Sequence, residues 1–94
     1  MNKVEKFKTM EKILREVEDL KNSQTAVIKK IGLIEAENMN LNDQELQKSL
    51  NVIYDGVHKN LQTVEGLFHT FSDSVATFKL KENITAEMLM DIKA

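Results

Sequence analysis

Apolar residues recur in steps of three and four along the first part of the chain, which is the spacing of one face of an α-helix. This spacing predicts a first helix from residue 3 to residue 38. The polar residues 21–25 interrupt the pattern, and we expect either a local bend or a polar layer that fixes the packing register there. The apolar positions are Val4, Phe7, Met10, Leu14, Val17, Leu20, Val27, Ile28, Ile31 and Ile34.

Asparagine and aspartate are concentrated in residues 37–43. Their side chains hydrogen-bond to nearby backbone and favour turns and helix caps, so we expect the chain to reverse over residues 39–42. Asn42, followed three residues later by Glu45, has the form of a capping box. A second helix is therefore predicted from residue 43 to residue 80.

The second helix continues the apolar pattern. Two successive steps of four, from Ile53 to Val57 to Leu61, predict a stutter with a straight or gently bent segment near Gly56. The apolar positions of this helix are Leu46, Leu50, Ile53, Val57, Leu61, Val64, Phe68, Phe71, Val75 and Phe78.

Two helices of similar length joined by a short turn should pack antiparallel. The sequence thus predicts an all-α fold, an antiparallel two-helix hairpin in a single domain over residues 1–94. Residues 81–94 form a short tail, in which Thr85 could cap an amphipathic segment containing Met88, Leu89 and Ile92. We expect this tail to become ordered only when a partner binds it.

The composition is that of a folded protein without a nucleic-acid partner. Hydrophobic residues make up 41% and charged residues 30% of the 94 residues, and the net charge is -2 without a basic stripe. No segment has the roughly 18 apolar residues of a membrane span, and the charged N-terminus does not resemble a signal peptide. We expect a cytoplasmic protein, or one secreted by a signal-peptide-independent route.

The sequence offers no catalytic or metal-binding constellation. His58 and His69 are three helical turns apart, too far to share one metal, and the chain has no cysteine. Ser72 and Ser74 lie on a predicted helix without an oxyanion hole. We therefore expect a protein that is not an enzyme and needs no cofactor.

The best candidate for a contact surface lies in residues 60–78, which hold three of the four Phe and only two formal charges. The apolar stripe extends beyond one seam at three places, where Leu67 stands beside Phe68, Ile13 beside Leu14, and Val27 beside Ile28. Burial by a partner and packing within the hairpin are both open for these flanking residues. The predicted partner-binding residues are Leu61, Val64, Leu67, Phe68, Phe71 and Val75.

A chain of about this length with two helices and an amphipathic tail resembles the small WXG-type proteins of the type VII secretion pathway of Gram-positive bacteria. The Trp-x-Gly turn of that family is missing, because the chain has no Trp and its turn reads NMNLND. The resemblance is closer to the small helical partners of LXG toxins, which commonly do not have that turn.

Some of those partner proteins carry an aromatic-x-x-x-acid export motif after the second helix. Phe78 and Glu82 have this form, and four residues on a helix bring them to one face. Phe7 and Glu11 match the same short pattern, so it is the place of Phe78 at the end of the second helix that marks the motif.

The resemblance implies a non-enzymatic targeting factor or chaperone. Such a protein would bind the helical N-terminal domain of an LXG-type toxin, with a second small hairpin protein as a further partner, and help to direct the toxin to the secretion machinery. The alternative is a self-associating coiled-coil structural or regulatory protein, a homodimeric four-helix bundle.

Overall fold

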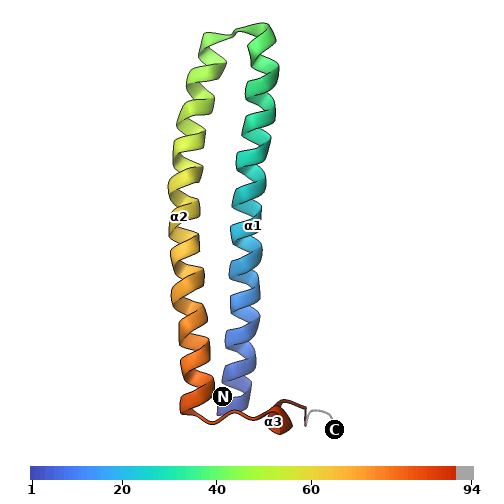
Figure 1. The fold of residues 1–94 in the computed structure, drawn as a ribbon, viewed down its shortest axis with the longest axis vertical. Helices are drawn as coiled ribbons and strands as arrows, with labels where there is room; N and C mark the ends of the chain where they lie inside the picture. The colour runs from blue at the N-terminus through green and yellow to red at the C-terminus, as the bar shows by residue number, and fades with distance from the viewer. Residues whose placement is uncertain (91–94) are drawn as a thin grey trace. The chain divides into compact units, whose positions relative to one another are not determined.

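The computed structural model describes residues 1–90 and shows two long helices that pack against each other as an antiparallel hairpin (Figure 1). Helix α1 spans Lys3–Leu41, α2 spans Gln44–Lys81, and a short α3 spans Ala86–Met90. The predicted all-α hairpin is confirmed. Within residues 1–90, no helix combines the length and the apolar character that a membrane span requires.

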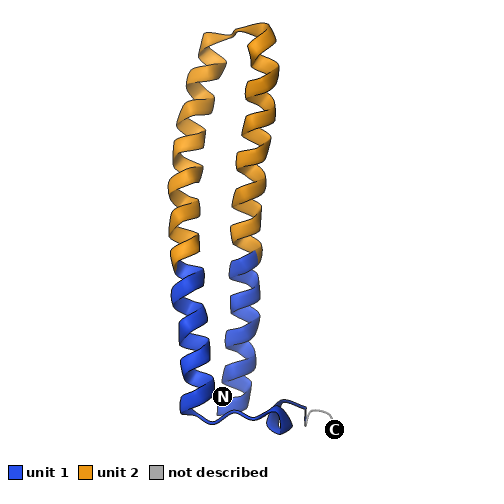
Figure 2. Cartoon of the chain, in the orientation of Figure 1, with its two compact units in different colours: residues 1–18, 67–94 blue, residues 19–66 orange. Residues whose placement is uncertain are grey.

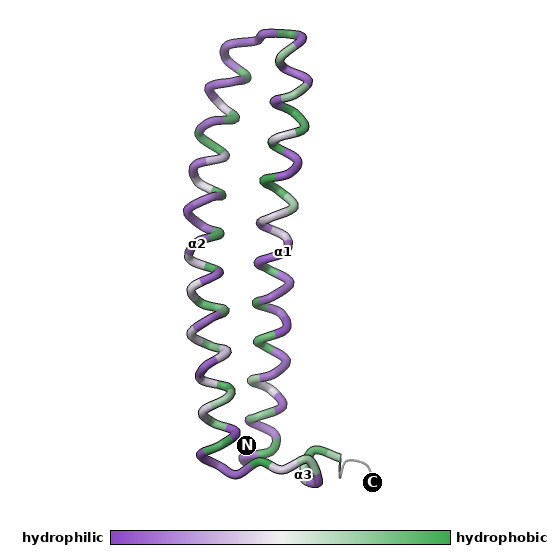
Figure 3. The backbone as a smooth tube through the Cα atoms, viewed as in Figure 1, coloured by the Kyte–Doolittle hydropathy of each residue, from purple (hydrophilic) through white to green (hydrophobic). Residues whose placement is uncertain are grey.

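The seam between α1 and α2 follows an unbroken heptad pattern. In α1 the seam positions alternate in steps of three and four from Phe7 to Asn38, and in α2 they do so from Leu50 to Phe78. The predicted stutter is wrong, because Tyr54 lies nearer the seam (38% exposed) than Ile53 (49%). Hydrophobic positions recur along both helices between hydrophilic ones (Figure 3).

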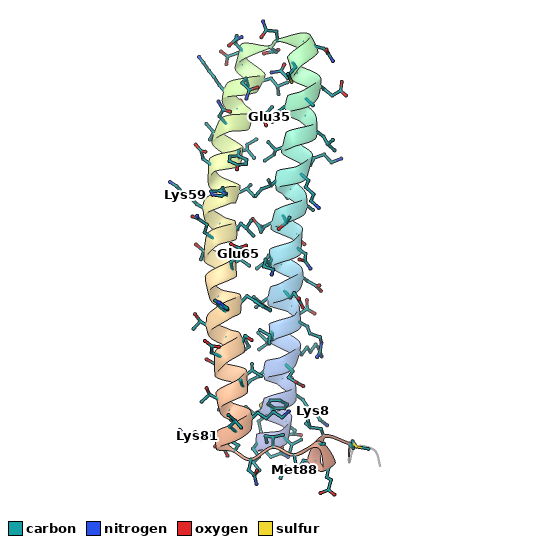
Figure 4. All side chains as sticks on the ribbon, viewed as in Figure 1. Lys8, Glu35, Lys59, Glu65, Lys81 and Met88 are labelled. Carbon is teal, nitrogen blue, oxygen red and sulfur yellow. The ribbon has the colours of Figure 1, made fainter. Side chains whose placement is uncertain are left out.

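The seam of α1 includes polar residues, which a search for apolar residues alone does not identify. Lys21, Gln24 and Glu35 are half-buried at seam positions. Leu20, Val27 and Ile34 were predicted on the seam, but each is more than a third exposed and lies one helical position to its side. The apolar residues alone therefore gave the wrong register for the middle of α1. The side chain of Glu35 lies between the two helices, whereas Lys59 is on the outer side of α2 (Figure 4).

The chain divides into two compact units, each built from a segment of both long helices (Figure 2). Unit 1 comprises residues 1–18 and 67–94, and unit 2 comprises residues 19–66. The single-domain organisation over residues 1–94 stays a prediction.

Unit 1 contains the main aromatic core of the chain. Phe7, Val75 and Ile84 are buried together. The ring of Phe7 stacks on that of Phe78, with centroids 6.5 Å apart. At the start of α1, the Asn2 side chain accepts a hydrogen bond from the Glu5 N–H at 2.8 Å, and the Glu5 carboxylate accepts one from the Asn2 N–H at 3.2 Å. This reciprocal capping box satisfies backbone donors at the start of the helix.

Unit 2 has a polar layer in its seam. The Asn60 side-chain amide donates a hydrogen bond to the Gln24 side-chain oxygen at 3.0 Å. Helix α1 runs without a break through this region. With Lys21 and Gln24 half-buried at seam positions, the polar layer expected at residues 21–25 is present.

The turn between the long helices is shorter than predicted. Helix α1 continues to Leu41 because Asn38 is buried and its side chain binds the backbone of Asp43, accepting from N–H at 2.9 Å and donating to C=O at 3.0 Å. Asn42 has a positive φ of 58° and ends α1. The cap of α2 is Asp43, which accepts from the Leu46 N–H at 3.0 Å, so the capping box predicted at Asn42 and Glu45 is wrong.

The first part of the predicted tail is ordered within unit 1. Asn83 has a φ of 53°, and the Ile84 N–H donates to the Lys79 C=O at 3.0 Å, while the Asn83 N–H donates to the Leu80 C=O at 3.2 Å. These two bonds form a Schellman motif that ends α2 and turns Ile84 into the core. Thr85 then caps α3 by accepting from the Met88 N–H at 3.3 Å. Ile92 lies outside the described residues.

Candidate helix-binding surface

The described residues contain no cluster suited to a metal ion. Within residues 1–90, no group of three or more His, Cys, Asp or Glu side chains is placed to hold one. His58 stacks on Tyr54 with ring centroids 5.6 Å apart, and His69 is exposed on α2.

The six residues predicted to bind a partner lie mostly on the side of α2 that packs against α1. Val64 and Val75 are buried, whereas Leu67 is 47% exposed. The remaining three are half-buried: Leu61, Phe68 and Phe71. The hairpin itself already covers most of this apolar surface, and the role of these residues in partner binding stays a prediction.

The predicted export motif lies at the end of α2 in unit 1. Phe78 is half-buried in the stack with Phe7, and the Lys6 Nζ is 5.3 Å from the centroid of the Phe78 ring. Glu82 is half-buried, and its backbone C=O accepts a hydrogen bond from the Lys3 Nζ at 2.9 Å. The aromatic ring of the motif thus packs against the core of unit 1.

A row of exposed apolar residues runs along α1 at intervals of seven. In unit 2 this α1 row consists of Leu20, Val27, Ile34 and Leu41, which are between 37% and 68% exposed. A repeat of seven keeps residues on one side of a helix that packs in heptads. Each residue of the row lies beside the seam rather than in it.

Helix α2 carries a second row in unit 2, with steps of three and four. None of its residues is charged, and they alternate between bulky and small or short polar side chains. This α2 row consists of Leu46, Ser49, Ile53, Gly56, Asn60 and Thr63; Leu46 is half-buried and the others are exposed.

Both rows lie on the same side of unit 2. Leu20, Val27 and Ile34 of the α1 row, and Ile53 and Asn60 of the α2 row, directly precede the first seam position of a heptad. Leu41 and Leu46 continue the two rows at an interval of seven residues. Reversal of chain direction in an antiparallel pair brings equivalent heptad positions to one side. The hydrogen bond from Asn60 to Gln24 joins the α2 row to α1. We call the two rows together the lateral face.

The opposite side of α2 in unit 2 has a different character. Its positions hold formal charges of both signs at Lys48, Asp55 and Glu65, together with polar side chains. A charged, mixed surface of this kind is typical of a solvated helix face. Along α2, the lateral face therefore differs from the opposite side of the helix because it carries no charged residue.

Unit 2 exposes more large hydrophobic residues than it buries. All of its residues are described, and its buried hydrophobic residues are Ile31, Leu50 and Val64. A pair of helices is a thin core, and an exposed apolar surface commonly marks a site that another molecule covers. Its exposed large hydrophobic residues are Leu20, Val27, Leu33, Ile34, Met39, Leu41, Val52, Ile53 and Tyr54.

The sequence contained a signal for part of this surface. Val27 beside Ile28 indicates an apolar stripe wider than one seam, and so does Leu67 beside Phe68, yet five of the six predicted binding residues lie on the seam of α2. The signal for the lateral face has two parts: the repeated seven-residue interval along the α1 row, from Leu20 to Leu41, and the uncharged row on α2.

No family model matches the chain, and neither a curated protein nor a solved structure matches it.

Proposed function

We propose that this protein is a non-enzymatic helix-binding partner protein, which uses the lateral face of unit 2 to bind helices of another protein. The observation that carries the proposal is the excess of exposed over buried large hydrophobic residues in unit 2. Helices that lie along the α1 row would bury this surface in a larger bundle.

The resemblance to LXG-toxin partners gives this proposal its specific form. The partner is then the helical N-terminal domain of an LXG-type toxin, joined in some complexes by a second small hairpin protein. The complex is directed to a type VII secretion system, with Phe78 and Glu82 as the export motif. Support from the chain itself is the hairpin fold, with Phe78 in the last turn of α2 and Glu82 directly after that helix.

The α1 row can supply useful affinity without any charged contact. Full burial of a Val, Leu or Ile side chain contributes about 1.5–3 kcal/mol before the costs of ordering and association are subtracted. The residues of the row are already partly covered, so each contributes less than this range. Several such contacts together are needed for a stable complex.

The test is capture of partners by the tagged full-length chain in its native host, followed by mass spectrometry. We expect one large protein with a helical N-terminal domain to co-purify. Val27→Asp and Ile34→Asp should abolish its recovery, because each places a charge in the contact. Ala36→Asp is the matched control, since Ala36 is exposed on the other side of α1.

Two outcomes would count against the proposal. Recovery of the same partner by both lateral-face variants would show that another surface binds it. Recovery of the chain without any other protein, as a defined oligomer, would support the self-associating structural or regulatory coiled coil instead.

A further inference from the structure

The α2 row has a shape that complements itself. Bulky residues alternate with small ones, so that Leu46 and Ile53 are each followed, three residues later, by Ser49 and Gly56. Gly56 is open, because a Cβ added there would meet no atom within 4 Å. The chain therefore leaves space beside Ile53 that its own side chains do not fill.

Two polar side chains of the α2 row, Asn60 and Thr63, already have hydrogen-bond partners, which lowers the cost of their burial. The Thr63 hydroxyl donates to the Lys59 C=O at 3.2 Å, and the Asn60 side-chain amide donates to Gln24 at 3.0 Å. A polar group that already has a hydrogen-bond partner costs much less to remove from water than one that has none.

From these features we infer that the α2 row binds the same row of a second copy of this chain, with the two α2 helices antiparallel. A two-fold axis between Ile53 and Gly56 places Ile53 of each copy opposite Gly56 of the other. It also places Leu46 opposite Thr63 and Ser49 opposite Asn60. Every bulky side chain then meets a smaller one, as close packing requires.

The lack of charge favours a second copy as the occupant. In a two-fold contact between identical surfaces, a charged residue near the axis would lie close to its own copy, so charge at the centre of the row would be repulsive. The α2 row has no formal charge to repel its copy. A parallel arrangement would instead set Ile53 against Ile53 and leave the space at Gly56 empty.

This inference rests on the proposed role of the lateral face in helix binding and assigns its two rows to different occupants. The α2 row joins two copies, and the α1 row binds the helical partner. The assembly would thus present two partner-binding rows.

The first test is the mass of the purified full-length chain by sedimentation equilibrium, with two matched glycine variants. We expect a dimer for the unmodified chain and for Gly32→Arg, and a monomer for Gly56→Arg. Both glycines have open space for a Cβ and belong to unit 2, but Gly32 lies on the side away from the lateral face. Circular dichroism should show equal helix content in all three.

The expected size of the effect is large because an isologous contact contains each substitution twice. We expect Gly56→Arg to raise the dimer dissociation constant by about a hundredfold or more. A monomeric unmodified chain, or equal dissociation constants for Gly56→Arg and Gly32→Arg, would overturn the inference.

The second test locates the two-fold axis. No other thiol can react in it, because the natural chain has no cysteine. A tagged Ile53→Cys chain is mixed with an untagged Gly56→Cys chain and oxidised under mild conditions. We expect a disulfide between the two chains. No such product should form when His58→Cys replaces Gly56→Cys, since His58 lies on the opposite side of α2. Equal yields from the two mixtures would overturn the assigned axis.

Partner capture separates failure of this inference from failure of the proposed function. Gly56→Arg should still recover the helical partner, because the α1 row is unchanged. Loss of partner recovery in Gly56→Arg, with a monomeric unmodified chain, would assign the α2 row to the partner protein. That result overturns self-pairing and leaves the proposed function in place.

Discussion

The rings of Phe7 and Phe78 stack almost in parallel, with 9° between their planes and 6.5 Å between their centroids. Two ammonium groups flank the stack, since the Lys6 Nζ lies over Phe78 at 5.3 Å and the Lys79 Nζ lies over Phe7 at 6.0 Å. Cations over aromatic faces contribute attraction in addition to apolar burial. The stack therefore links the start of α1 to the end of α2 in unit 1.

The stability of unit 1 should depend strongly on Phe7, which is the most deeply buried large side chain in the described residues. We expect Phe7→Ala to lower the free energy of unfolding by about 3–5 kcal/mol, because it removes a packed ring and leaves a cavity. Urea unfolding followed by circular dichroism measures the change.

Leu80→Ala is the control for this prediction. Leu80 is 83% exposed, so its truncation should alter the free energy of unfolding by less than about 0.5 kcal/mol. If the two variants unfold at the same urea concentration, the stack is not the core of unit 1. Should Phe7→Ala be unfolded without urea, Phe7→Leu gives a smaller loss that can still be measured.

Asn38 should be the main determinant of the tight turn. Its buried side chain makes two hydrogen bonds to Asp43, so Asn38→Ala would remove the acceptor of the Asp43 N–H, whereas the Asp43 C=O would keep the bond from the Gln47 N–H at 3.1 Å. We expect a loss of about 1–3 kcal/mol in the free energy of unfolding. Asn40→Ala has the same change in helix propensity at an exposed site and should not show this loss. Equal stabilities for the two variants would contradict the role of Asn38.

The two helices and their antiparallel pairing follow from steps of three and four along the sequence, because that spacing describes a helix face whatever it packs against. The register of α1 does not follow in the same way. The seam passes through Lys21 and Gln24 while Leu20 and Val27 lie beside it. Contacts across the hairpin, such as Asn60 with Gln24, fix that register, and hydrophobicity along one helix does not contain this information.

The same reasoning explains the position of the candidate surface. Residues 60–78 are rich in Phe and poor in charge, and the sequence alone favours a surface that faces a partner. Such a composition also suits the inside of a hairpin, and the structure buries Val64 and Val75 there. Only the exposed fraction of each side chain distinguishes residues of the seam from residues of the lateral face.

The end of α2 should depend on the left-handed backbone of Asn83. An alanine in this conformation is strained by roughly 1–2 kcal/mol, whereas glycine adopts it without a steric penalty. We expect Asn83→Ala to lower the thermal unfolding midpoint and Asn83→Gly to preserve it or raise it. A midpoint that is equal in both variants would contradict the Schellman motif as the device that turns Ile84 into the core.

The export role proposed for Glu82 can be separated from its structural role. Glu82→Gln removes the charge and keeps the size, so we expect binding of the helical partner to persist while secretion of the complex is lost. Glu87→Gln, on the exposed side of α3, should leave secretion unchanged. Immunoblots of culture supernatant and cell lysate give both readouts. Undiminished secretion with Glu82→Gln would remove this residue from the motif.

The central claim is that other helices cover the lateral face of unit 2 in the working protein. The most direct measurement is the rate of thiol labelling in living cells of the native host for single-cysteine variants, since the natural chain contributes no cysteine. We predict that a membrane-permeant maleimide labels Val27→Cys slowly and Gly32→Cys rapidly, although both label rapidly in the chain after urea unfolding. Equal rapid labelling of the two variants in cells would show an uncovered lateral face and contradict the account.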